Sequence, residues 1–204
     1  MNKKPTAQRK VEIITTAGEI LISEGLNNLT IKNLAFKNGI SESAIYRHFK
    51  DKQDILLGLV DQFEEDLFRA IDIPMKKQDN SIIQLKEIMQ THMGFAQERK
   101  SLLYAITSAA IHIKDDVLRN KVLDVTDRYI SRISQILIRA KKDKLLREDI
   151  DVVAASFAFW GLIRSSSAHY ALTNFTVSPV NKFKTLWNIY LHGIEKNNGG
   201  ASIC

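Results

Sequence analysis

The sequence has few of the residues that build cross-linked or catalytic sites. Only one of its 204 residues is cysteine, so neither an internal disulfide nor a multi-cysteine zinc site can form. Its five histidines show no metal-ligand spacing, and phosphate-binding glycine loops and the Gly-x-Ser-x-Gly turn of hydrolases are absent. We therefore expect no enzymatic activity, no metal and no cofactor.

Long apolar runs and prolines are also scarce. No stretch approaches the roughly 18 uninterrupted apolar residues of a membrane-spanning helix. The polar start, Met1 to Lys4, is not followed by an apolar secretory core. We expect a cytoplasmic protein with no membrane partner. Three prolines and no convincing strand pattern predict an all-α fold of about nine helices. Pro74 is expected to end the fourth of them, with a linker over residues 76–80, and either Asp149 or Asp151 can cap a later helix.

The positive charge is concentrated near the beginning of the sequence. Of a net charge of +6, residues 1–52 carry nine Lys or Arg against five Asp or Glu, which is +4. The remaining residues are nearly balanced. An excess of this sign suits a nucleic-acid partner, although many other soluble proteins share it.

Helix start and stop signals crowd residues 30–52. Thr30 can cap one helix, and Asn38-Gly39 supplies residues that tolerate a left-handed turn. Ser41 can cap a second helix, on which Ile45 and Phe49 share an inward face. Asp51 can cap a third helix that begins at Lys52. A plain helical bundle explains each signal singly, but their order is typical of a helix-turn-helix.

These residues carry a resemblance to a known family. Residues 9–56 are similar to the DNA-binding domain of the TetR family of bacterial transcriptional repressors. The matching positions are Ile13, Ile14, Ala17, Leu21, Gly25, Thr30, Leu34, Ala35, Gly39, Ile40, Ser41, Ile45, Tyr46, His48, Phe49, Lys52 and Leu56. The resemblance implies an N-terminal three-helix DNA-binding domain at residues 1–52. A helical effector-binding and dimerisation domain at 53–197 and a disordered tail at 198–204 would follow.

Two positions depart from the family pattern. Asn38 stands where a small alanine is commonest, and Ser43-Ala44 replaces the usual glycine, proline or threonine. The second departure falls on the recognition helix, so the operator sequence of relatives does not transfer to this chain.

The DNA-contacting residues are assigned by exposure and by family position. Arg47 can donate two hydrogen bonds to guanine, and Ser43 and Ala44 lie one turn earlier on the same side. Glu42 either accepts from cytosine or stabilises the helix start. The resemblance implies phosphate or sugar contacts for Thr30, Tyr46, His48 and Lys52, although His48 can equally be a packed core residue. The full predicted set is Thr30, Ser41, Glu42, Ser43, Ala44, Tyr46, Arg47, His48 and Lys52.

The last two predicted helices, within residues 149–196, are apolar on more than one side. Such helices must be buried on both sides, either inside the subunit or at a dimer interface. TetR relatives dimerise through these helices, so the resemblance favours the interface, and two subunits would read an inverted repeat of DNA. The predicted interface residues are Ala158, Phe159, Gly161, Phe183, Trp187, Tyr190 and Ile194.

The family also implies a small-molecule pocket among the C-terminal helices. The candidate lining is Phe63, Leu67, Met89, Met93, Tyr104, Ser108, Tyr129, Phe157, Trp160 and Arg164. Methionine and aromatic side chains adapt to apolar ligands, while ordinary core packing explains each residue alone. Because Arg164 is a charge on a largely apolar helix, it needs an internal acid, an acid across the dimer or an anionic, lipid-like effector.

Two functions remain open from the sequence. The first is a homodimeric transcriptional repressor that is released from DNA by a small, largely apolar molecule. The second is a DNA-bound structural or adaptor protein of the same fold with no small-molecule effector. An internal cavity favours the first, whereas a filled interior with an exposed apolar patch favours the second.

Overall fold

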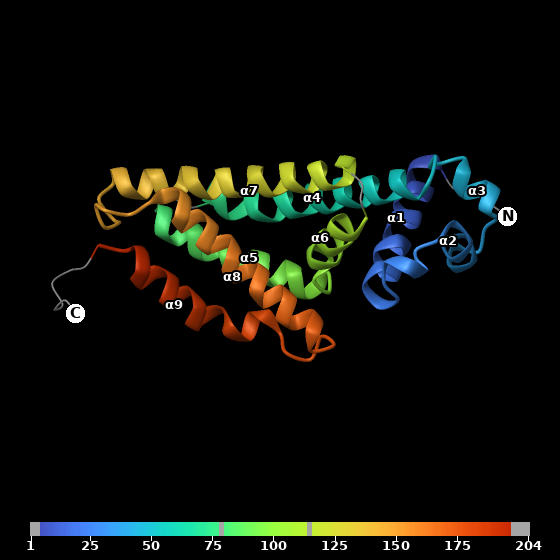
Figure 1. Cartoon of the computed structure of the whole chain (residues 1–204). Helices are drawn as coiled ribbons and strands as arrows, with labels where there is room; N and C mark the ends of the chain where they lie inside the picture. Colours follow the sequence, from blue (N-terminus) through green and yellow to red (C-terminus); the bar gives the residue numbers. More distant parts are fainter. Residues whose placement is uncertain (1–4, 78–79, 114–115, 197–204) are drawn as a thin grey trace. The chain divides into compact units, whose positions relative to one another are not determined.

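The computed structural model describes residues 5–77, 80–113 and 116–196. Within these ranges the chain forms nine α-helices and two short 3₁₀-helices, and the only strand-like pairing is one isolated bridge (Figure 1). The predicted all-α fold of about nine helices is therefore confirmed. None of the described helices is both long enough and apolar enough to cross a membrane.

The helices follow the predicted start and stop signals closely. They are α1 (Thr6–Ser23), η1 (Leu26–Asn28), α2 (Ile31–Asn38), α3 (Glu42–Tyr46), α4 (Lys52–Lys77), α5 (Ser81–Glu98), α6 (Leu102–His112), α7 (Asp116–Lys142), α8 (Val152–Leu172), η2 (Pro179–Lys182) and α9 (Phe183–Ile194). The predicted disordered tail, residues 198–204, lies outside the described residues.

The chain divides into two compact units. Unit 1 contains α1 to α3, the first part of α4 up to Leu67, and residues 99–125 with α6. Unit 2 contains the end of α4, together with α5, most of α7, α8 and α9. The predicted helix-turn-helix domain, residues 1–52, lies within unit 1.

The core of unit 1 gathers around α1. The α1 residues Ile13, Ala17 and Ile20 are fully buried, and α1 packs against α2 and α6. A Cβ at Gly18 would stand 3.3 Å from a methyl group of Leu59 and 3.6 Å from one of Leu102. The absence of a side chain at this glycine therefore lets α4 and α6 approach α1 closely.

The core of unit 2 is formed by α5, α8, α9 and η2, which pack on one another. It contains a polar pair, because the His92 ring nitrogen Nδ1 lies 2.9 Å from the Tyr129 hydroxyl and both side chains are buried. Burial lowers the pKa of His92 to about 3, and the nearby Arg164 charge acts in the same direction. His92 is therefore neutral at neutral pH.

Side-chain caps fix the starts of two long helices. The Asp51 carboxylate accepts a hydrogen bond from the Asp54 amide at 2.8 Å, and the Asp54 carboxylate accepts one from the Lys50 amide at 2.9 Å. The Asp151 carboxylate accepts hydrogen bonds from the Val153 and Ala154 amides of α8 at 2.9 and 3.0 Å. Each cap satisfies backbone donors that have no partner within the helix. The predicted cap at Asp51 is confirmed, and of the two candidates Asp149 and Asp151, the cap of α8 is Asp151.

One predicted helix end is wrong. Proline at position 74 was expected to stop the fourth helix, but α4 continues to Lys77 with Pro74 inside it. Because Pro74 stands in the last turn, it removes a single backbone bond, to the Ala70 carbonyl, and its own ring is buried. The predicted linker 76–80 is correspondingly shorter, and residues 78–79 lie outside the described residues.

A backbone clip closes the end of unit 2. The Arg147 amide donates to the Ile194 carbonyl at 3.1 Å, and the Lys196 amide donates to the Leu145 carbonyl at 3.1 Å. These two bonds form the isolated antiparallel bridge between Leu146 and Glu195. The clip ties the end of α9 to the connection between α7 and α8.

Candidate nucleic-acid interface

The corner between α2 and α3 has the geometry of a tight helix-turn-helix. Gly39 adopts a left-handed conformation, with φ 63° and ψ 35°. Its amide donates to the Phe36 carbonyl at 3.1 Å, and the Ile40 amide donates to the Ala35 carbonyl at 3.0 Å. No atom lies within 4 Å of a Cβ built at Gly39, so the backbone conformation, and not lack of space, favours glycine here.

Two hydroxyl caps hold the short helices of this corner. Thr30 Oγ1 accepts from the Asn33 amide at 3.1 Å, and Ser41 Oγ accepts from the Ala44 amide at 3.2 Å. Both side chains are exposed. A capping hydroxyl keeps its own proton for donation, although the Ser41 and Ser43 hydroxyls also lie 2.8 Å apart. Thr30 can therefore cap α2 and donate to a phosphate at the same time.

The recognition helix α3 is short and presents a polar face. Ile45 and Phe49 are buried, as predicted, and anchor the segment inward. Glu42, Ser43 and Tyr46 are exposed, with Tyr46 keeping 55% of its surface accessible, while Ala44 is half-buried.

The structure corrects the placement of Arg47. We expected Arg47 on the recognition helix itself, but α3 ends at Tyr46 and Arg47 is the residue that follows it. Its backbone remains near helical values, at φ −71° and ψ −18°, and its side chain is exposed. Arg47 therefore lies at the C-terminal end of the exposed face of α3 and not in the middle of it.

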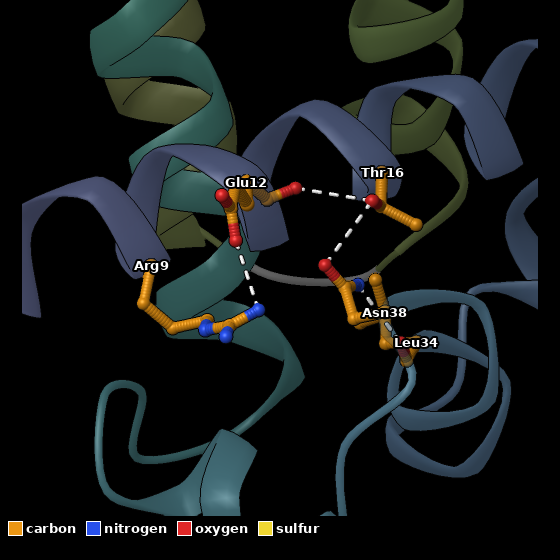
Figure 2. A network of polar contacts seen from close by, with 5 residues as sticks. All are labelled: Arg9, Glu12, Thr16, Leu34 and Asn38. Carbon is orange, nitrogen blue, oxygen red and sulfur yellow. Dashed lines mark hydrogen bonds and ion pairs between the residues drawn. The ribbon is translucent and has the colours of Figure 1, made fainter. Parts of the chain in front are cut away.

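Asn38, the first departure from the family pattern, is held by polar contacts (Figure 2). Its side-chain amide donates to the Leu34 carbonyl at 2.8 Å, and its oxygen lies 3.4 Å from the Thr16 hydroxyl of α1. On the same helix, Arg9 pairs with Glu12 at 2.8 Å. A polar link between α1 and α2 thus occupies the place where relatives have a small apolar residue.

A second polar link joins the end of α1 to α2. The Glu24 carboxylate lies 2.7 Å from the Lys37 ammonium and accepts from the Asn33 side chain at 2.9 Å. The hydrogen bond from Lys37 has the larger effect on the pKa of Glu24, that from Asn33 the smaller, and both lower it. Two separate contacts therefore fix α2 against α1.

His48 is half-buried and lies near cationic side chains. Its Nδ1 atom is buried and has no hydrogen-bond partner among the described residues. Burial lowers the pKa of His48, and the charges of Arg47, Lys10 and Arg9 lower it further. His48 is thus neutral at neutral pH, as the packed alternative for this residue requires.

Lys10 is a cationic residue that lies outside the predicted contact set. Its ammonium lies 5.6 Å from the centre of the Phe49 ring, so the start of α1 reaches the segment that follows α3. Lys10 is exposed and contributes to the positive potential beside Arg47. From the sequence, Arg9 and Lys10 can add contacts to the DNA backbone, although a solvated helix end explains both residues equally well.

Lys52 already has a partner within unit 1. Its ammonium donates to the Leu26 carbonyl at 2.9 Å, and burial lowers its pKa. An ammonium group has three N–H donors, so two remain for other acceptors. A phosphate contact by Lys52 would therefore add to its contact with η1.

The predicted dimer residues fall into two groups. Phe159, Trp187, Tyr190 and Ile194 are buried within unit 2. The Phe159 and Tyr190 rings meet edge to face with centroids 5.4 Å apart, and the Tyr190 hydroxyl donates to the Ala155 carbonyl at 3.1 Å. These four side chains pack inside the subunit, which was the alternative to an interface role. Phe183 is half-buried.

The outer face of α8 carries the other group. Ala158 is exposed and Gly161 is half-buried. Phe157, predicted as a pocket residue, is 53% exposed on this face, and Val153 is 60% exposed one turn earlier. An apolar stripe with small residues therefore lies on the surface of α8.

The remaining candidate pocket residues are divided between the units. Phe63, Leu67, Tyr104 and Ser108 belong to unit 1, while Met89, Met93, Tyr129, Trp160 and Arg164 belong to unit 2. Met89, Met93 and Tyr129 have almost no accessible surface, so no water-sized space adjoins them. The Arg164 guanidinium lies 5.3 Å from the centre of the Trp160 ring.

Comparison with known families agrees with this geometry. Residues 13–59, which include α2 and α3, match the family model described as bacterial regulatory proteins, tetR family. The helix-turn-helix region of the chain therefore matches the TetR family. The sequence-based recognition of the family is confirmed, and the match spans the region on which it was based.

Similarity to known proteins also extends along almost the whole chain. The nucleoid occlusion factor SlmA of Marinomonas sp. (strain MWYL1) is 26% identical over 196 residues, covering 96% of this chain and 98% of that protein. SlmA of Vibrio cholerae serotype O1 is 28% identical over 189 residues, covering 91% of this chain and 94% of that protein. The similarity therefore extends well beyond the helix-turn-helix.

Solved structures of TetR-type regulators share the fold. The fatty acid degradation regulator FadR from Bacillus halodurans has a TM-score of 0.82 at 18% identity, covering 95% of this chain and 98% of that chain. FadR from Bacillus subtilis, solved with stearoyl-CoA, has a TM-score of 0.80 at 19% identity, covering 91% and 99%. These likenesses confirm an N-terminal helix-turn-helix followed by a helical C-terminal region.

Proposed function

We propose that this protein is a transcriptional regulator that binds an inverted-repeat operator as a homodimer. The observation that carries this proposal is the helix-turn-helix corner of unit 1. The caps of α2 and α3 and the left-handed Gly39 fix the backbone of this corner. The buried residues of α3 anchor the helix, and its polar face stays exposed. A helix held in this way can enter the major groove of DNA.

Base reading is assigned to the exposed end of this face. Arg47 is the proposed reader of guanine, because its planar fork can donate to N7 and O6 together. Ser43 and Ala44 are proposed to contact neighbouring base edges. Thr30 and Tyr46 are proposed to contact the DNA backbone, which sets the register of the helix without reading sequence.

Dimerisation is assigned to the exposed stripe on α8. Val153 and Phe157 supply apolar area, and Ala158 and Gly161 allow a second helix to approach closely. The buried aromatic residues Phe159 and Tyr190 would support this surface from inside unit 2. Two subunits are needed because one short helix reads too few base pairs for useful specificity.

Release by a small, largely apolar molecule forms part of the proposal. The methionine and aromatic residues of unit 2 suit such a ligand, and FadR from Bacillus subtilis was solved with an acyl thioester bound. Since Met89, Met93 and Tyr129 are closely packed, a ligand at these residues would have to open the bundle. Such an opening is a physical route from binding to a change in DNA affinity.

The second candidate is a DNA-bound structural protein with no small-molecule effector. Two observations favour it: the similarity to nucleoid occlusion factors covers up to 96% of the chain, and the centre of unit 2 is filled. In this case the exposed apolar surface of α8 would serve protein contacts alone.

The test is selection of bound sequences from random DNA with the full chain. We expect an inverted repeat whose half-sites are about one helical turn apart, and an affinity that falls steeply as salt rises. Mass measured in solution should show a dimer. Selected sequences without two-fold symmetry, or a flat salt response, would contradict the proposed DNA-binding mode.

The two candidates are separated by ligand screening on the selected site. Acyl compounds of different length are added to the protein–operator complex, and DNA release is followed by fluorescence anisotropy. Release by one chemical class supports the regulator. If no compound releases the DNA while the protein occupies many sites spread along the chromosome, the structural protein is the better description.

A further inference from the structure

A small cavity lies within unit 2, which contains none of the residues assigned to DNA contact. It is lined by the C-terminal half of α8, the chain leading into η2, and the first turns of α9. Its volume is about 250 Å³. Space of this size accommodates a compact molecule such as a single substituted ring, because an apolar cavity of roughly 150 Å³ already holds benzene.

The charge around this cavity favours an anion. Lys182 and His169 both line it and are exposed, and none of its eight lining residues is acidic. Within the described residues neither side chain forms a salt bridge. An ammonium group and an imidazole in the lining are therefore available as hydrogen-bond donors.

The seryl hydroxyls of α8 add donors that can be redirected. Ser165 and Ser166 both donate to the Leu162 carbonyl, at 3.1 and 2.8 Å. The same carbonyl also belongs to the backbone ladder of α8, and a carbonyl oxygen has only two lone pairs. One hydroxyl, that of Ser165 at the longer distance, can therefore turn toward a ligand without leaving the carbonyl unsatisfied.

Part of the cavity lining is apolar and held in place. Val177, Pro179 and Leu186 provide its hydrocarbon surface. Ser178 accepts from the Val180 amide at 3.2 Å and donates to the Gln97 side chain of α5, which fixes η2. The lining of the cavity thus combines hydrogen-bond donors and a positive charge with apolar surface.

We propose that this cavity binds a small carboxylate with a compact apolar body. The carboxylate accepts from Lys182, from His169 and from the redirected Ser165 hydroxyl, while the body packs on Val177, Pro179 and Leu186. This binding does not depend on the proposed DNA-binding function, because every contact comes from unit 2.

The experiment titrates the full-length protein with benzoate, in the absence of DNA, by isothermal calorimetry. Benzamide, which has the same shape without the charge, and inorganic phosphate, which has charge without the ring, are the comparison probes. Benzoate should bind most tightly. The Lys182→Gln variant should bind benzoate about fivefold more weakly, as expected for the loss of a partly exposed charged contact.

Two further variants locate the site. Val177→Phe should abolish benzoate binding by filling the apolar part of the cavity, whereas Lys184→Gln, an equal charge change on an exposed α9 residue outside the lining, should leave it unchanged. Circular dichroism confirms that each variant is folded. The proposal is overturned if benzoate does not bind, if benzamide or phosphate binds as well as benzoate, or if Lys182→Gln and Lys184→Gln have equal effects.

Discussion

The helix-turn-helix segment of unit 1 and the α8–α9 pair of unit 2 place their large side chains in opposite ways. In the first, Tyr46 and Arg47 extend outward from a backbone fixed by caps and a left-handed glycine. In the second, Phe159, Trp187 and Tyr190 turn inward and leave Phe157 as the large aromatic side chain on the surface of α8. Local backbone signals therefore organise the DNA-contacting segment, whereas tertiary packing organises the C-terminal helices.

The largest expected effect separates two phenylalanines of α8. Phe159→Ala should lower the free energy of unfolding by about 3–5 kcal/mol, because it removes a fully buried ring. Phe157→Ala should change the free energy of unfolding of the monomer little but weaken self-association. Urea denaturation and sedimentation measure the two quantities. Equal losses of monomer stability would show that the inward and outward faces of α8 have been misassigned.

A smaller effect is expected from two cations of unit 1. Arg47→Ala should cost about 1–3 kcal/mol of affinity for the selected operator and relax its specificity at one position. Lys10→Ala should weaken binding to operator and to random DNA by the same factor. It should also reduce the slope of log affinity against log salt concentration by about one. Anisotropy titrations on both DNAs distinguish these outcomes. An equal loss of affinity for both DNAs in Arg47→Ala would contradict the base-reading role of Arg47.

The smallest effect, taken over a single pH unit, depends on pH and concerns the interior of unit 2. Because the folded protein keeps His92 neutral down to a pKa of about 3, the unfolded chain takes up the proton first as pH falls below 6.5. The free energy of unfolding should therefore decrease by about 1.4 kcal/mol per pH unit through this window. It should stop decreasing below the folded pKa.

The His92→Gln variant tests this assignment. Glutamine can keep a hydrogen bond to Tyr129 but does not titrate, so urea denaturation at several pH values should show a shallower slope than in the unchanged protein. His48 contributes in the same direction, since its pKa is also lowered, and its share should remain in the variant. An unchanged slope would mean that His92 is accessible to protons.

Much of the fold was predictable because its signals are local. Thr30, Ser41, Asp51 and Asp151 each cap the helix that follows them, and Gly39 takes the left-handed conformation expected of it. A cap depends on atoms within three residues, so the sequence window contains its whole cause. The helix-turn-helix and its family could be recognised for this reason.

The remaining features lack such local signals. The sequence did not show that α3 ends before Arg47, since no glycine or proline marks that end. Nor could it show which aromatic face of α8 turns inward. Both faces are apolar, and the buried face packs on residues far along the chain, such as Tyr190, whose ring meets Phe159 and whose hydroxyl donates to the Ala155 carbonyl. The end of α4 was predicted too early, because a proline destabilises a helix less when it stands in the last turn.

The clip between Leu146 and Glu195 has a consequence for limited digestion with trypsin. The end of α7 and the connection after it offer cleavage sites after Lys141, Lys142, Lys144 and Arg147 within a short stretch. A protease must draw the chain into its own active site in extended form, and here the backbone is already paired with residues 194–196. Cleavage after Arg147 therefore requires the end of α9 to separate from the connection. The cleavage rate should follow the frequency of this separation more closely than the surface exposure of Arg147.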